Sequence, residues 1–225
     1  MKISQLITYC LSIPKTIYFN FRCLNLNEAI KIPIFISYKV KFKRLKRNVI
    51  KIDSDYISTL MIKIGFNGTD EISPKRSIIN MENGKIIFKG TCAISEGCTI
   101  GVSNGGVLQF GKNFTANKNF FISCNKHVIF SDDVMLGWNV TVFDANGHPV
   151  FKDNVKVSPF KPIKIGEHVW ICSEVHILKG SEIPNGSIVA YGSLISKAFK
   201  DTNSLYGGIP AKKIQDGICW KRHND

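Results

Sequence analysis

An aliphatic residue stands at every sixth position between residues 165 and 195. The series is Ile165, Ile171, Ile177, Ile183, Val189 and Ile195, and the fifth residue of each unit is also restricted, as Val169, Val175, Ser181, Ser187 and Ser193. An amphipathic helix would need apolar positions three and four residues apart, and simple alternation would not single out every sixth residue. A period of six predicts short strands separated by tight corners. Three such strands make one triangular coil of a parallel β-helix, with coils stacked about 4.8 Å apart.

A looser form of the same repeat extends toward the N-terminus. Its apolar positions are Phe88, Ile94, Ile100, Phe110, Ala116, Ile122, Phe130, Leu136 and Val142. We therefore expect an all-β fold with little helix between residues 85 and 196. The repeat stops at 143–164, which predicts a loop leaving the stack, and long loops on a rigid scaffold often carry function.

The two ends of such a stack need covering, because a β-helix exposes unpaired strand edges. We predict a basic capping region over 1–60, the β-helix over 61–200 and a closing segment over 201–225. The cap is expected to contain a short amphipathic helix over 3–13 and strand-like runs over 30–42. Pro14 and Lys15 interrupt the first apolar run, so it predicts neither a signal peptide nor a membrane-spanning helix.

Charge changes this picture at the N-terminus. The chain has a net charge of +13, and residues 1–52 contain eleven Lys and Arg against Glu28 alone, which gives 11 − 1 = +10. Such a run is either a solvated face or a surface for an anionic membrane or a phosphate-bearing, lipid-linked substrate. No nucleic-acid-binding module is evident, so we do not expect a nucleic-acid partner. Seven cysteines without a CxxC pair indicate reduced thiols and a cytoplasmic protein, with peripheral contact at the inner face of the membrane as an extension.

Four segments occur in an order and spacing that resemble a known family. They are NFTANKNFFIS from residue 113, SDDVMLGWNVTVFDANGHPV from 131, IKIGEHVWICSEVHILKG from 163 and GGIPAKKI from 207. The chain resembles the hexapeptide-repeat acyltransferases, in particular the galactoside, maltose and polysaccharide O-acetyltransferases. The resemblance implies a left-handed parallel β-helix and a homotrimer with active sites between subunits. It also implies acetyl-CoA as donor, no metal, and a carbohydrate acceptor, lipid- or nucleotide-linked, in surface polysaccharide biosynthesis.

The resemblance assigns a catalytic role to two residues. His148, in the excursion, matches the general base that takes the proton of the acceptor hydroxyl, a role that suits a group with an ordinary pKa of about 6.5. Ser173 matches the residue whose backbone N–H stabilises the tetrahedral intermediate. Asp144 would orient His148 or contact the sugar, or it is a turn residue. Asn117 and Asn119 would face the acceptor, or they hold strained corners.

Further matches place the coenzyme near the last coils. The matching residues are Trp170, Gly192, Ser196, Lys197, Lys212 and Lys213. Two departures from the family are visible. Cys124 and Asn125 stand where the galactoside enzymes carry an acidic residue, which puts the same sugar in doubt, and Cys172 replaces a glycine.

Three other functions remain open. An amino-sugar N-acetyltransferase or a xenobiotic acetyltransferase would use the same base and coenzyme with another acceptor. A catalytically silent β-helix would serve as a scaffold. A carbonic anhydrase with the same coil would need three histidines that converge on a metal ion. His168 and His176 are eight residues apart, which does not place them at equivalent positions of the six-residue repeat. The other histidines are His127, His148 and His223.

Overall fold

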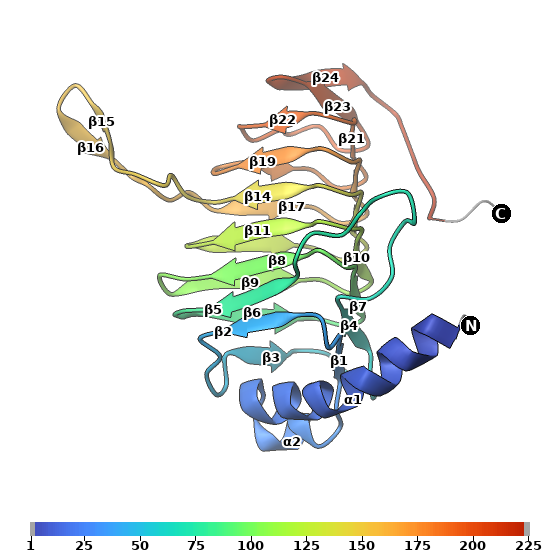
Figure 1. Ribbon diagram of the computed structural model, residues 1–225. Helices are drawn as coiled ribbons and strands as arrows, with labels where there is room; N and C mark the ends of the chain where they lie inside the picture. Colours follow the sequence, from blue (N-terminus) through green and yellow to red (C-terminus); the bar gives the residue numbers. More distant parts are fainter. Residues whose placement is uncertain (1–2, 223–225) are drawn as a thin grey trace.

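The computed structural model describes residues 3–222, which form a stack of triangular coils with two helices at its N-terminal end (Figure 1). Three sheets make the faces of the prism. The first sheet contains β1 (Ile34–Ile36), β4 (Ile62–Ile64), β7 (Cys92–Ile94), β10 (Phe114–Ala116), β13 (Met135–Leu136), β18 (Trp170–Ile171), β21 (Ile188–Val189), β23 (Leu205–Gly208) and β24 (Ala211–Gln215). The second contains β2 (Lys41–Lys43), β5 (Ile78–Met81), β8 (Thr99–Val102), β11 (Phe121–Cys124), β14 (Thr141–Phe143), β19 (His176–Leu178) and β22 (Leu194–Ile195). The third contains β3 (Ile50–Ile52), β6 (Gly84–Phe88), β9 (Gly106–Phe110), β12 (His127–Phe130), β17 (Ile163–Ile165) and β20 (Glu182–Ile183).

The six-residue repeat is confirmed by the strand register. Ile165 pairs with Ile183 one coil further on, and Ile171 pairs in parallel with Val189. The repeat aliphatics between 165 and 195 are all buried, as are the small residues at the fifth positions. No helix lies between residues 85 and 196, as expected. Each aliphatic therefore points into the prism, and the period follows from three short strands per coil.

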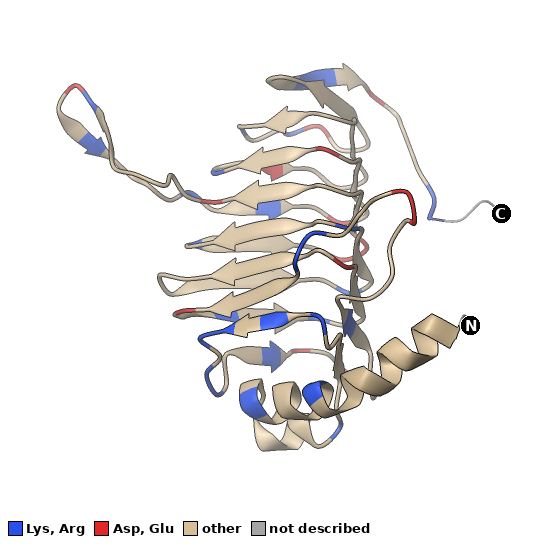
Figure 2. Cartoon of the chain, in the orientation of Figure 1, with Lys and Arg blue, Asp and Glu red and all other residues tan. Residues whose placement is uncertain are grey.

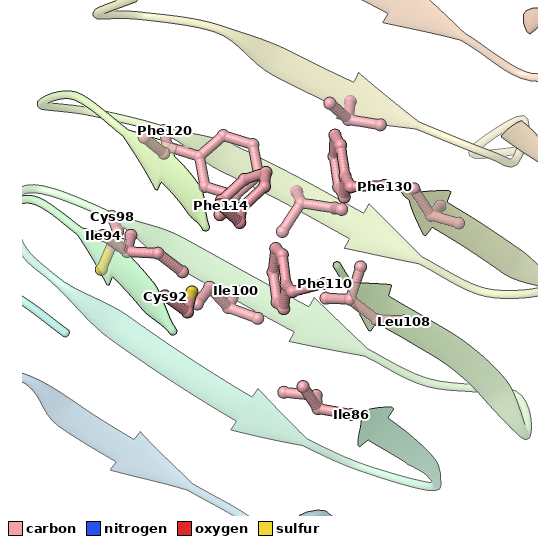
Figure 3. Packing of buried hydrophobic residues seen from close by; sticks show 14 of the residues in the cluster. Ile86, Cys92, Ile94, Cys98, Ile100, Leu108, Phe110, Phe114, Phe120 and Phe130 are labelled. Atoms are coloured by element: carbon pink, nitrogen blue, oxygen red, sulfur yellow. The ribbon is translucent and has the colours of Figure 1, made fainter. Parts of the chain in front are cut away.

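Aromatic residues fill the prism in its middle coils (Figure 3). Phe88, Phe110 and Phe130 occupy the same position on successive strands of the third sheet, and their rings stack at centroid distances of 5.3 and 5.6 Å. Neighbouring coils lie about 4.8 Å apart, which brings equivalent rings into contact. At this position of the third sheet the looser repeat has phenylalanine, and the later coils have Ile165 and Ile183.

The N-terminal helix is longer than the 3–13 expected from the sequence. Helix α1 runs over Ile3–Cys23 with Pro14 inside it, and a short α2 follows over Leu26–Ala29. The prediction that Pro14 ends the apolar segment was wrong, because contacts to the stack hold α1 on both sides of the proline. Ser12 and Thr16 flank it, and both are buried; Thr16 bonds to Ile36 in β1, and Ser12 bonds to Tyr38 just after β1.

Helix α1 covers the open edge of the first sheet with side-chain hydrogen bonds. Asn20 Oδ1 accepts from the Ile34 N–H at 3.1 Å, and its amide donates to the Ile34 carbonyl at 2.7 Å. Thr16 Oγ1 accepts from the Ile36 N–H at 3.1 Å, and Ser12 Oγ accepts from the Tyr38 N–H at 3.0 Å. A strand edge left open exposes unpaired N–H and C=O groups, and this polar stripe satisfies them.

The β-helix begins earlier than predicted. Strands β1–β3 form a complete coil within the range 1–60 that was assigned to the cap, and they pair with β4, β5 and β6. The cap proper is therefore α1 and α2, and the boundary placed at 60–61 falls between β3 and β4. At the other end, β23 adds in parallel to β21, and β24 turns back antiparallel on β23.

Two segments leave the stack. The first excursion, residues 65–77, lies between β4 and β5 and was not expected from the sequence. The second, residues 144–162, lies between β14 and β17 and confirms the predicted loop; it projects as an antiparallel hairpin of β15 (Val150–Lys152) and β16 (Val155–Val157) (Figure 1). Among the described helices, none is long and apolar enough to cross a membrane.

Candidate active site

His148 lies on the second excursion, just before the projecting hairpin. Its side chain is exposed, and its ring makes no hydrogen bond within residues 3–222. It lines a groove of about 510 Å³ between the excursion and the second sheet. The excursion contributes His148, Asn146 and Phe160 to its lining, and the second sheet and its corners contribute Phe143, Ser123, Asn104 and Asn125. The imidazole is thus free to exchange a proton with a molecule bound there.

Asn125 is the centre of a polar network on the wall of this groove. Its Oδ1 accepts from the Ser103 hydroxyl at 2.8 Å and from the Asn104 amide at 3.1 Å, and its own amide donates to Ser123 Oγ at 3.2 Å. Amides and hydroxyls both donate and accept, which suits recognition of sugar hydroxyl groups. The sequence reasoning missed Ser103, Asn104 and Ser123 and treated Asn125 only as a departure. Aligning the coils would have shown them stacked at one corner.

Asp144 does not contact the groove, in contrast to its assignment as a substrate-binding residue. Its side chain is completely buried, and its carboxylate accepts hydrogen bonds from the backbone N–H groups of residues 125, 126 and 127, at 2.8, 2.7 and 3.0 Å. The sequence left a turn role open, and the contacts support a structural one. Asp144 fixes the root of the excursion to the preceding coil and thereby positions both Asn125 and the segment that carries His148.

Asn117 and Asn119 lie beside the first excursion, and the contacts they make are those of the structural role that the sequence left open. In this chain they hold the first excursion: Asn117 Oδ1 accepts from the Thr69 N–H at 3.1 Å, and Asn119 accepts from the Lys75 N–H at 2.7 Å while donating to the Ser73 carbonyl at 3.1 Å. Asn119 has a φ of 63°, in the left-handed region that asparagine tolerates. Neither residue lines the His148 groove. Their oxygens are occupied by the protein's own backbone.

Ser173 sits at a tight corner one coil beyond. A Cβ added to Gly137 would lie 2.6 Å from the Ser173 backbone nitrogen, so the two coils are in close backbone contact. Ser173 Oγ accepts from the Trp138 N–H at 3.1 Å, whereas the Ser173 N–H donates to no acceptor among the described residues. Ser173 does not line the His148 groove of the same chain.

The residues matched to the coenzyme lie on the last coils, away from the groove. Trp170 is half-buried beside Trp220, whose ring stacks on His168 at 4.3 Å; Trp220 was not predicted. Gly192 has a positive φ of 67° and open space where a Cβ would stand. Its corner is therefore open to a molecule running along the backbone.

The basic residues of this region differ in their partners. Lys213 bonds to Asp216 at 3.0 Å and Asp201 at 3.2 Å, and these carboxylates, Asp216 first, raise the pKa of its ammonium group. Lys197 lies 5.4 Å from the Phe199 ring centroid. Lys212 and Ser196 are exposed, and the described residues form no ion pair with Lys212. Lys212 and Lys197 are therefore better placed than Lys213 to meet a phosphate.

Other reactive groups do not compete with His148. All seven cysteines are free thiols. Burial, followed by the charge of Asp144, raises the pKa of Cys124 to about 12, and burial also raises the pKa of Cys172. The nucleophilic form of cysteine is the thiolate, so these thiols are packing residues. Within residues 3–222 no three His, Cys, Asp or Glu side chains converge as metal ligands, and His223 lies outside the described residues.

No protein-family model matches the chain. Among curated proteins, the galactoside O-acetyltransferase of Escherichia coli K12 is 35% identical over 117 residues, which cover 51% of this chain and 56% of that one. The putative lipopolysaccharide biosynthesis O-acetyl transferase WbbJ of the same organism is 27% identical over 144 residues, covering 59% and 72%. The chain spans about half the length of the first curated relatives it matches.

Among solved structures, the polySia specific acetyltransferase NeuO superposes with a TM-score of 0.53 at 20% identity, over 85% of this chain and 80% of that one. This likeness shows the fold and supplies the hand of the coil, which the strand register does not give. The chain is a left-handed parallel β-helix, as predicted, and its sequence is similar to O-acetyltransferases over about half its length.

Proposed function

We propose that this protein is an acetyl-CoA-dependent O-acetyltransferase that acts on a carbohydrate hydroxyl with His148 as general base. One observation carries the proposal: an exposed imidazole with no partner among the described residues stands in a groove lined by amide and hydroxyl groups. Phe143 adds an exposed ring to the same groove, against which the apolar face of a sugar can pack. The similarity to a galactoside O-acetyltransferase supports the same reaction class.

The reaction needs only proton transfer and acyl transfer. His148 takes the proton of the acceptor hydroxyl as its oxygen attacks the thioester carbonyl of acetyl-CoA. The resulting oxyanion accepts a hydrogen bond from a backbone N–H, for which we assign that of Ser173. Collapse of the intermediate breaks the C–S bond, and the imidazolium returns the proton to the leaving thiolate. The products are the acetyl ester and free coenzyme A, and the histidine is regenerated.

A homotrimer would complete the site. His148 and Ser173 do not share a groove within one chain, which supports a site in which a neighbouring copy supplies the N–H of Ser173. The projecting hairpin exposes Val150, Phe151 and Val155, which are 45, 62 and 70% exposed. An isolated two-stranded hairpin is marginally stable in water, and these side chains would pack on the next subunit. The free cysteine thiols of this protein and its proposed thioester donor also support a cytoplasmic enzyme of polysaccharide biosynthesis.

Replacement of His148 by alanine tests the mechanism. We expect acetyl transfer from acetyl-CoA to fall by about 100- to 10,000-fold, the usual contribution of a placed base, with circular dichroism and coenzyme A binding unchanged. His176→Ala is the matched control, because this exposed histidine bonds to Thr141 and does not line the groove.

Full activity of His148→Ala would refute the mechanism. Wild-type transfer to amines but not to sugar hydroxyls would favour the N-acetyltransferase alternative, and light scattering that returns a monomer of full activity would exclude the shared site.

A further inference from the structure

Helix α1 exposes an apolar face to solvent. The face toward the prism combines Phe19 and Cys23 of the core with Ser12, Thr16 and Asn20, whose side chains bond to the backbone of residues 34–38, whereas the opposite face is apolar. Ile3, Ile7, Leu11, Ile17, Tyr18 and Phe21 are each between 42 and 78% exposed. A surface helix of a globular protein normally turns its apolar stripe to the core. The apolar face of α1 therefore needs an occupant from outside the described chain.

The helix cannot rotate to bury this face without losing the edge of the first sheet. The hydrogen bonds from Thr16 and Asn20 satisfy N–H and C=O groups of β1 that are buried beneath α1. Leaving such groups without partners is costly. The packing of Phe19 in the core further fixes the orientation. The apolar face is thus held outward by the fold itself.

Positive charge surrounds this end of the stack (Figure 2). Helix α2 and its C-terminal residue add Leu26 and Ile30, which are 64 and 63% exposed. Around them, Arg22, Lys31, Lys46 and Arg47 form no ion pair with described residues. Glu28, the acidic residue of the first 52, is buried. The result is an apolar surface with a cationic border.

We propose that this N-terminal end docks on a membrane surface of anionic phospholipid, with α1 lying in the plane of the interface. Interfacial helices bind through buried apolar area together with attraction of basic residues to anionic headgroups, and this end supplies both. A second copy of the chain fits less well, because two copies joined through this end would oppose charges of +10 each. The docked orientation stands the coil axis on the membrane, with the His148 groove on a later coil.

Vesicle co-sedimentation tests the proposal. Wild-type protein is expected to bind mixed phosphatidylcholine–phosphatidylglycerol vesicles and to bind phosphatidylcholine vesicles weakly. The triple variant Ile7→Gln, Leu11→Gln, Tyr18→Gln keeps good helix formers on α1 and should lose binding at least about tenfold. Ile214→Gln is the matched control: it removes an apolar side chain that is 60% exposed at the other end of the molecule, and it should bind like wild type.

A charge variant and an activity assay distinguish the remaining explanations of vesicle binding. Lys46→Gln with Arg47→Gln should weaken binding severalfold at low salt, with the difference vanishing at high salt. Acetylation of a soluble acceptor should be unchanged in the triple variant, so a failure of docking is distinguishable from a failure of the proposed reaction. Absence of wild-type binding, or equal binding of the triple variant with intact helix content, would overturn the proposal. So would a smaller oligomer for the triple variant in solution, because it would identify a second copy as the occupant.

Discussion

The two excursions from the β-helix are attached to it in different ways. The first, 65–77, is tied along its length by side chains from the stack, with Asn117 and Asn119 bonding to its backbone at residues 69, 73 and 75. The second, 144–162, is tied at its root through Asp144, and its hairpin projects free of the prism (Figure 1). The same chemistry, a short Asx side chain that accepts backbone N–H groups, anchors both.

The difference shows which hydrogen-bonding groups are left free to bind a ligand. In the first excursion the side-chain oxygens of both anchoring residues accept hydrogen bonds from the protein's own backbone. In the second, Asp144 provides the anchor, and the His148 ring, which lines the groove, has no hydrogen-bond partner among the described residues. A polar residue at a β-helix corner is therefore a weak sign of substrate binding by itself, and the sign strengthens when another residue already holds the loop.

The largest effect that separates the excursions is expected for Asp144→Ala. Three backbone N–H groups would lose their acceptor in a buried site, and each unsatisfied buried group costs about 1–3 kcal/mol. We expect a loss of at least about 3 kcal/mol in the free energy of unfolding, together with loss of acetyl transfer because the root of the second excursion moves. Denaturant titration and initial rates measure the two effects.

Asp144→Asn is the matched variant, since its remaining oxygen can still accept from part of this turn. Its stability should lie between those of wild type and alanine. If Asp144→Ala were as stable as wild type yet inactive, the carboxylate would act on substrate, and its role as an anchor would be wrong.

A smaller effect, on stability but not on activity, is expected for Asn119→Ala. The substitution removes two hydrogen bonds to the first excursion and places alanine at a φ of 63°, so we expect a loss of about 1–2 kcal/mol in unfolding free energy. The turnover number of the folded protein should not change. Asn119→Gly removes the same bonds without the backbone strain and separates the two contributions. A tenfold fall in turnover at unchanged stability would instead support the acceptor role that the family resemblance implies.

The sequence predicted the repeating part of the molecule well, because one local rule governs each coil. Ile165 and Ile183 occupy equivalent positions in successive coils and pair with each other, so the spacing of the repeat in the sequence predicts which residues are in contact. It predicted α1 and the first coil poorly. The continuation of α1 past Pro14 depends on Thr16 bonding to Ile36, twenty residues away, and no local pattern reports such a contact.

The site was predicted in part for the same reason. His148 was chosen as the candidate base because it stands where the period breaks and within a motif that resembles a known family, and the structure places it in a groove. Asn119 and Asp144 were assigned to substrate because residue type alone does not tell whether a side chain's acceptors are already occupied. That depends on which loop folds over the corner, and the first excursion had no signal in the repeat.

The smallest expected effect concerns Asn117→Ala and tests whether the two excursions are independent. Asn117 Oδ1 accepts from the Thr69 N–H at 3.1 Å and from the Lys118 N–H at 2.8 Å, and its side chain is half-buried. Water can replace part of these bonds, so we expect a loss of about 0.5–1.5 kcal/mol. Hydrogen exchange of the Thr69 amide should accelerate, while that of Asn146, which donates to the Pro159 carbonyl at 2.8 Å at the root of the second excursion, should not change. Faster exchange at both amides would show that the excursions open together, and they could then no longer be regarded as independently anchored.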